Sequence, residues 1–118
     1  MNAHSHLDGH EFKAMLLAGY TWLEHHKEIV NQLNVFPVPD GDTGTNMTLT
    51  MRAAWREIDL SDDADVGHVA QAVAQGALMG ARGNSGVILS QILRGMTHAF
   101  RNKPTITAHD LALSLIHI

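Results

Sequence analysis

The residues of this chain best suited to chemistry are two aspartates, Asp40 and Asp42, separated by a single glycine. Two prolines before them favour an extended backbone, and the glycines around them allow a tight turn. Two carboxylates held this close repel each other unless a cation lies between them. Hard oxygen ligands on a rigid turn suit Mg²⁺, which leaves coordination positions for phosphate oxygens. Thr43, Thr45 and Asn46 follow and add short side chains that carry oxygen.

The same segment also fits a turn that leads into a helix, because Asp and Thr cap helices while Gly and Pro form turns. For an isolated Asp-Gly-Asp sequence this is the more common structure. An EF-hand is excluded. With Asp40 as its first ligand, Thr45 would replace the turn glycine and Met51 would replace the bidentate glutamate.

A second stretch, residues 80–91, contains three glycines spaced by three and several small side chains. Such a pattern ends one helix and begins another, and the exposed N–H groups of the new helix can cradle a phosphate. The stretch has neither the lysine of a Walker A loop nor the preceding strand of a Rossmann fingerprint. Taken alone, it fits an interhelical turn at least as well. Arg82 fits either a phosphate contact or a solvated loop charge, and we slightly favour the latter.

Composition narrows the class of protein. The chain has 118 residues, of which 45% are hydrophobic and 17% charged, which is typical of a soluble globular domain. A net charge of −4 gives no general nucleic-acid footprint. There are no cysteines to form disulfides or a thiolate metal site. No apolar run reaches the roughly 18 residues that span a bilayer, and we expect a cytoplasmic protein.

Apolar residues recur at helical spacing along most of the chain and predict an all-α fold, an antiparallel helical bundle. We expect helices over about residues 9–32, 44–58 and 64–79, one beginning in the 80–91 stretch, and a last one opened by a capping box of Thr107 and Asp110. Trp22 and Leu23 are predicted to lie in the core. The acidic segment 59–65 is predicted to be a solvated linker that ends in a helix cap.

The domain boundaries follow from these elements. Residues 1–8 are expected to be a disordered tail, residues 9–112 a partial domain, and residues 113–118 a non-native tail left by a truncated reading frame. In an antiparallel bundle the second and fourth helices run the same way, so that both glycine-containing loops lie at one end. Mg²⁺ held by the first loop and N–H groups from the second would then meet on one polyphosphate, as phosphoryl transfer requires.

The two motifs also carry a family resemblance. Residues 34–47, NVFPVPDGDTGTNM, resemble the acidic motif of the DhaL-type nucleotide-binding domain of bacterial fatty acid kinase A, and residues 79–91, MGARGNSGVILSQ, resemble its second motif. The likeness covers about residues 9–112. It implies part of an eight-helix antiparallel barrel that holds ATP and a pair of Mg²⁺ ions at one end, as in the ATP-binding subunit of dihydroxyacetone kinases.

The resemblance also implies roles for individual residues. Asp40 and Asp42 would coordinate Mg²⁺, and Asn34 lies close to where the related kinases place a further aspartate. The phosphates of ATP would be contacted from the two loops by Thr43, Thr45, Asn46, Gly83, Asn84, Ser85 and Gly86. It assigns no catalytic residue in this part of the domain.

The activity implied is the phosphorylation of a fatty acid carboxyl group, presented by a separate fatty-acid-binding protein, to give an acyl phosphate. We expect the fragment alone to be inactive, and any homodimer to form through regions outside these 118 residues. Two alternatives stay open. One is a dihydroxyacetone-type kinase subunit, against which the segment 36–39 argues by resemblance. The other is a non-catalytic helical interaction domain whose glycine loops only turn corners.

Overall fold

The computed structural model of the chain describes residues 6–33 and 41–116 and, within them, five α-helices. These are α1 (Gly9–Gln32), α2 (Thr43–Arg56), α3 (Val66–Gly80), α4 (Gly83–Ala99) and α5 (Ala108–Ile116). The described residues contain no β-strand beyond one isolated antiparallel bridge between Leu7 and Ile106. The predicted all-α class is therefore confirmed.

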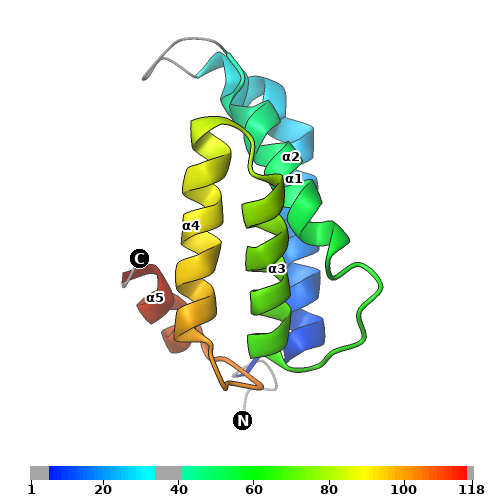
Figure 1. The fold of residues 1–118 in the computed structure, drawn as a ribbon, viewed down its shortest axis with the longest axis vertical. Helices are drawn as coiled ribbons and strands as arrows, with labels where there is room; N and C mark the ends of the chain where they lie inside the picture. The colour runs from blue at the N-terminus through cyan, green and yellow to red at the C-terminus, as the bar shows by residue number, and fades with distance from the viewer. Residues whose placement is uncertain (1–5, 34–40, 117–118) are drawn as a thin grey trace.

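The four longer helices run up and down the long axis of the molecule (Figure 1). Helix α1 ascends, α2 descends to the right of α3, α3 ascends and α4 descends, so that successive helices are antiparallel. Short α5 packs against the lower part of α4. The start of α2 and the connection from α3 to α4 consequently lie at the same, upper end. This is the arrangement that the sequence predicted for the two loops.

The core lies where α2, α3 and α4 meet, with Phe12 of α1 closing its lower end. Phe12 and Phe100 meet edge to face, with ring centroids 5.9 Å apart. Burying such side chains supplies most of the stability of a small helical domain, at about 25 cal/mol per Å² of apolar surface. The buried hydrophobic cluster consists of Phe12, Ala54, Ile58, Val66, Val69, Ala70, Val73, Ala74, Ala77, Leu93, Met96, Phe100 and Ile106.

Small residues let α3 approach α2 closely. A Cβ atom built on Gly76 would lie 2.8 Å from the carbonyl oxygen of Ala53 and 3.1 Å from the Cα of Ala54. Real Cβ atoms do not tolerate such contacts, so that a larger residue here would push the two helices apart. Gly80, one turn further on, lies against the side chain of Ala53 in the same way.

Side-chain caps fix three of the helix starts. The Asp8 carboxylate accepts the N–H of Glu11 at 2.9 Å, and the Glu11 side chain returns to the N–H of Asp8. Thr107 and Asp110 exchange the equivalent pair of bonds at the start of α5, which confirms the predicted capping box. Asp65 caps α3 by accepting the N–H of His68 at 3.1 Å, as expected for the end of the acidic linker.

One core assignment was wrong. Leu23 is buried as predicted, but Trp22 leaves 59% of its surface exposed. Its ring stacks on that of His26, at 4.2 Å between centroids. The two apolar residues are adjacent on a helix and point about 100° apart, so that α1 buries Leu23 while Trp22 faces solvent.

The predicted domain boundaries remain predictions. Residues 1–5 lie outside the described residues, whereas Leu7 already pairs with Ile106 and Asp8 caps α1. At the other end, residues 113–116 continue α5, and the Ser114 hydroxyl bonds the carbonyl oxygen of Leu111 at 2.6 Å.

Candidate functional site

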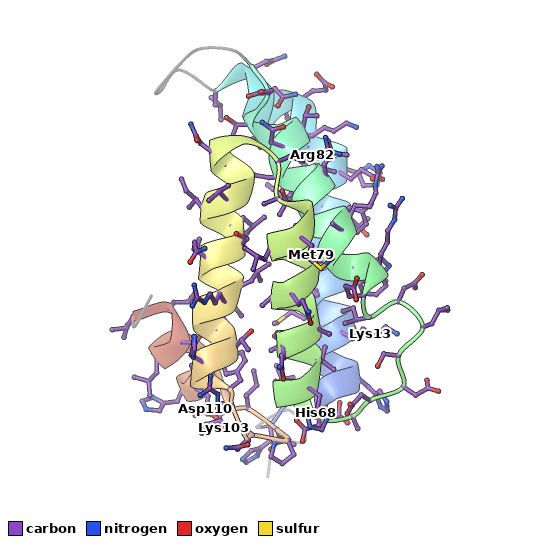
Figure 2. All side chains as sticks on the ribbon, in the orientation of Figure 1. Lys13, His68, Met79, Arg82, Lys103 and Asp110 are labelled. Atoms are coloured by element: carbon purple, nitrogen blue, oxygen red, sulfur yellow. The ribbon has the colours of Figure 1, made fainter. Side chains whose placement is uncertain are left out.

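The candidate site is the upper end of the bundle, where the first turns of α2 and α4 lie side by side. Figure 2 shows Arg82, the residue before α4, next to the first turns of α2. The 34–40 part of the acidic motif lies outside the described residues, and with it the predicted Mg²⁺ ligands Asn34 and Asp40. The structure describes the third predicted ligand, Asp42, and all of the predicted phosphate-contacting residues.

Asp42 occupies the N-cap position of α2, yet its side chain makes no capping hydrogen bond. An Asp at this position ordinarily accepts the N–H of the second or third helical residue. The interpretation of Asp42 as a side-chain cap is therefore not what the structure shows. Its half-buried carboxylate lies at the positive end of the α2 dipole, with its oxygens available to a cation or to solvent.

Asn31, near the end of α1, fixes the first turn of α2. Its side-chain oxygen accepts the N–H of Thr45 at 3.0 Å, and its side-chain nitrogen donates to the Thr45 hydroxyl at 3.0 Å. Gly44, beside it, packs directly on the backbone carbonyl of Lys27, where a Cβ atom would collide. Thr45 therefore anchors α2 to α1, and its hydroxyl keeps one hydrogen to donate toward a ligand.

Thr50 joins the two loops from below. Its hydroxyl donates to the carbonyl oxygen of Asn46 at 2.8 Å and accepts the backbone N–H of Arg82 at 3.1 Å. The Thr50 side chain is fully buried. Because the hydroxyl is bonded on both sides, the start of α4 has a fixed position relative to the first two turns of α2.

Gly83, the first residue of α4, lies against the side-chain amide of Asn46. Its φ of +64° is in the left-handed region that favours glycine. Asn46 thus brings the first motif into contact with the second. Thr43, at the first position of α2, is half-buried.

The first turn of α4 divides into an exposed and a packed side. Asn84 is exposed, whereas Ser85 and Met47 line a small, mainly apolar cavity of about 200 Å³ between α2 and α4. Gly86 is buried, and a Cβ there would collide with the Thr50 hydroxyl. Gly86 therefore serves the close packing of α4 on α2, while the turn from Gly83 to Ser85 presents N–H groups to the upper end.

Arg82 contributes its backbone to the site. Its N–H is held by Thr50, its carbonyl oxygen accepts the N–H of Gly86 at 3.0 Å, and its side chain makes no cap for α4 and is exposed. This agrees with the solvated charge favoured from the sequence.

The fit of Mg²⁺ rests on the acidic residues of the first loop. Within residues 6–33 and 41–116 no group of three or more His, Asp or Glu side chains is arranged to hold a metal ion. The described part of the predicted ligand set is the Asp42 carboxylate, which is free of helix capping. One or two carboxylates with phosphate oxygens are a common Mg²⁺ environment, so the donor chemistry fits the ion.

A larger polar cavity of about 490 Å³ lies elsewhere, between the start of α3 and the end of α4. Its lining includes His68 and Arg101. His68 is at the lower end of the molecule, opposite Arg82 (Figure 2). This cavity is therefore separate from the two loops, and none of the residues predicted to bind nucleotide lines it.

The sequence did not predict that Asn31 and Thr50 hold the first turns of α2 and α4 in place by hydrogen bonds. Asn31 carried a weak signal, as an amide side chain shortly before the acidic motif. Thr50 lies between apolar residues of α2 and carried no signal, because its partner Arg82 becomes a neighbour only in the folded chain.

Comparisons with known proteins fit this geometry. The DAK2 domain matches residues 37–117, and the chain belongs to this family. The family is related to kinases, and its DhaL-type members bind nucleotide. The match contains both Asp42 and the whole second loop, so that the two loops that meet in the structure belong to one family domain.

Individual relatives are much longer than this chain. Protein YloV of Bacillus subtilis (strain 168) is 51% identical over 109 residues, which cover 92% of this chain and 20% of YloV. Uncharacterized proteins of Staphylococcus saprophyticus and Staphylococcus haemolyticus are 44% and 43% identical over 110 residues, which cover 93% of this chain and 20% of theirs. The chain therefore spans about a fifth of the length of these relatives.

In the part of the chain that the structure describes, no helix is both long and apolar enough to cross a membrane.

Proposed function

We propose that this chain is the ATP- and Mg²⁺-binding part of a cytoplasmic kinase that phosphorylates a fatty acid carboxyl group. The acyl substrate would be presented by a separate fatty-acid-binding protein, and the product would be an acyl phosphate. The observation that carries the nucleotide part is the meeting of two helix N-termini at one end, joined through Thr50 and Asn46.

The arrangement supports phosphate binding for a physical reason. The first N–H groups of a helix lack partners within the helix, and the helix dipole places partial positive charge at the same point. In α2 and α4 these positive ends face the same region of the molecule. Two such ends attract an anion more strongly than one, and a polyphosphate is long enough to contact both.

The acidic residues of the first loop would balance this positive character. Asp42, together with Asp40 and Asn34, would hold Mg²⁺, which neutralises charge on phosphate oxygens during phosphoryl transfer. The chain's own contribution is to hold the triphosphate in a fixed place and to keep the two loops in a fixed position relative to each other. We assign no catalytic residue, and the site of the phosphate acceptor belongs outside the two loops.

The choice of fatty acid as acceptor rests on the resemblance of the first motif, above all of residues 36–39, to fatty acid kinase A. The DAK2 family by itself is equally consistent with a dihydroxyacetone-type kinase subunit. The two acceptors differ in chemistry, since one offers a carboxylate and the other a primary hydroxyl. The products, an acyl phosphate and a phosphate monoester, are separated by their reaction with hydroxylamine, which consumes only the acyl phosphate.

Calorimetry on the full-length protein tests the nucleotide part. We expect ATP to bind in the presence of Mg²⁺ and to lose measurable binding in the Asp40→Ala/Asp42→Ala double variant. Unchanged ATP affinity in that variant would overturn the proposal. Incubating the protein with ATP and a fatty acid on its binding protein, and in parallel with dihydroxyacetone, then identifies the acceptor by hydroxylamine trapping.

A non-catalytic interaction domain is the second candidate, favoured by the exposed apolar side chains. Leu60, Met79 and Leu33 leave 95%, 78% and 72% of their surfaces exposed. Exposed apolar side chains of this size can contribute to contacts with other protein segments. This candidate predicts that the melting temperature does not change when Mg-ATP is added, whereas a ligand that binds the native state must raise it.

A further inference from the structure

Two buried threonines on α2 provide a natural comparison. Thr48 and Thr50 are 2% and 0% exposed, and each donates its hydroxyl to the carbonyl oxygen four residues earlier, at 2.7 and 2.8 Å. They differ in what else the oxygen does. The Thr50 hydroxyl also accepts the N–H of Arg82 at 3.1 Å, whereas the bond shown for Thr48 stays within its own helix.

The Arg82 peptide is the point at which α4 begins. Arg82 is the N-cap residue of α4, and its carbonyl oxygen accepts the N–H of Gly86 at 3.0 Å. Holding the N–H of Arg82 therefore fixes the position from which the first turn of α4 starts. Gly86 lacks a Cβ atom, which leaves room for the Thr50 hydroxyl against that turn.

We propose that Thr50 is a positioning residue of the nucleotide site, whose hydroxyl sets the second phosphate-binding loop relative to the first. This inference rests on the proposed function. It states that nucleotide affinity depends on a residue that is fully buried and does not touch the ligand. The geometry behind it is a single oxygen bonded to the first motif through Asn46 and to the second loop through Arg82.

Valine has the shape of threonine and lacks the hydroxyl, so that Thr50→Val removes both bonds with little change in volume. The N–H of Arg82 then has no acceptor at this position, and the start of α4 is free to shift. Groups that must be held within fractions of an ångström lose binding strength when they shift. We expect the Kd of the full-length protein for Mg-ATP to rise about tenfold in Thr50→Val.

Two further variants separate positioning from stability. Thr48→Val removes an equally buried hydroxyl from the same helix, and we expect it to lower the melting temperature while leaving the Kd for Mg-ATP within about twofold of the original. Thr50→Ser keeps the hydroxyl and loses one methyl group, so that it should restore most of the affinity that Thr50→Val loses.

Amide hydrogen exchange supplies a measurement that needs no nucleotide. In the ligand-free protein, Thr50→Val should speed the exchange of the Arg82 N–H at least tenfold, while Thr48→Val leaves it unchanged. Two results together support the inference. The loss of Mg-ATP affinity should be smaller in Thr50→Ser than in Thr50→Val, and the Arg82 N–H should exchange faster in Thr50→Val.

The failures are distinguishable. If the unaltered protein does not bind Mg-ATP, the proposed function falls. If it binds Mg-ATP, and Thr50→Val matches Thr48→Val in both affinity and exchange at Arg82, the nucleotide site stands and the positioning role of Thr50 is overturned.

Discussion

Gly83, at the start of α4, lies directly against the side-chain amide of Asn46 in the first turn of α2. The two residues belong to different sequence motifs, and each lies in the first turn of a helix that begins at the upper end of the bundle (Figure 1). Two features of the structure favour glycine at position 83. Its φ is +64°, and the space where a Cβ would lie is taken by Asn46.

Replacing this glycine should therefore damage both stability and binding. A left-handed backbone costs a residue with a Cβ about 1–2 kcal/mol. We expect Gly83→Ala to lower the free energy of unfolding by about that amount, measured by urea denaturation, and to weaken Mg-ATP binding because the Asn46 side chain must move.

Gly19 offers the matched control. It lies in the middle of α1 with no atom within 4 Å of a built Cβ. Alanine is favoured over glycine in a helix interior by about 1 kcal/mol, so Gly19→Ala should raise the stability of the chain. A stability loss in Gly19→Ala, or none in Gly83→Ala, would contradict this account of the two glycines.

The bond pair between Asn31 and Thr45 predicts a stabilising role for a residue outside both motifs. Asn31→Ala removes two hydrogen bonds that tie α2 to the end of α1. We expect a loss of about 1–2 kcal/mol in the free energy of unfolding. Gln32→Ala, at the neighbouring exposed position, should change it by under about 0.5 kcal/mol. Equal losses in the two variants would argue against the anchor.

The capping box of α5 predicts a pH dependence. The backbone N–H of Thr107, followed by Lys103 at 3.4 Å, holds the pKa of the Asp110 carboxyl below its ordinary value. A carboxyl whose pKa is lowered by folding stabilises the folded chain above the unfolded pKa of about 4. That stabilisation is lost as the pH falls through the lower, folded pKa.

The test compares Asp110→Ala with the unaltered chain by denaturant unfolding at a series of pH values. The difference in free energy of unfolding should be constant from pH 7 down to about 5 and shrink below about 4. A difference that persists unchanged into strong acid would show that the carboxylate's charge contributes nothing.

Much of the fold was predictable because the sequence signals of a helix, its apolar spacing and its capping residues, are local. Apolar spacing gave α1 its bounds, and glycine and capping residues such as Thr107 and Asp110 marked where helices end and begin. The approach of the two loops was also predictable, since antiparallel helices return to the same end. The Trp22 assignment failed because periodicity shows that a helix has an apolar face, whereas its neighbours decide how wide a strip is covered.

The correction can be measured. Leu23→Ala should cost about 2–4 kcal/mol, because it opens space between α1 and its neighbours. Trp22→Ala removes a larger but mostly exposed side chain and should cost under about 1 kcal/mol. If Trp22→Ala proved the more damaging of the two, the burial seen for α1 would be wrong.

The contacts that hold the two loops of the candidate site together could not be predicted from the sequence for a similar reason. Thr50 and Arg82 are far apart in the chain, and a threonine within a helix is ordinarily unremarkable. Their hydrogen bond depends on how closely α4 packs on α2, which Gly86 permits. The residues that could contact a ligand followed from motif chemistry, while the residues that hold those motifs in place required the structure.

The central claim is that one nucleotide contacts the starts of α2 and α4 together. Amide hydrogen exchange of the full-length protein, with and without Mg-ATP, tests it most directly. We predict slower exchange on binding in both Thr43–Asn46 and Gly83–Gly86. Protection confined to one of these turns, or protection instead around His68 and Arg101 at the opposite end, would contradict it.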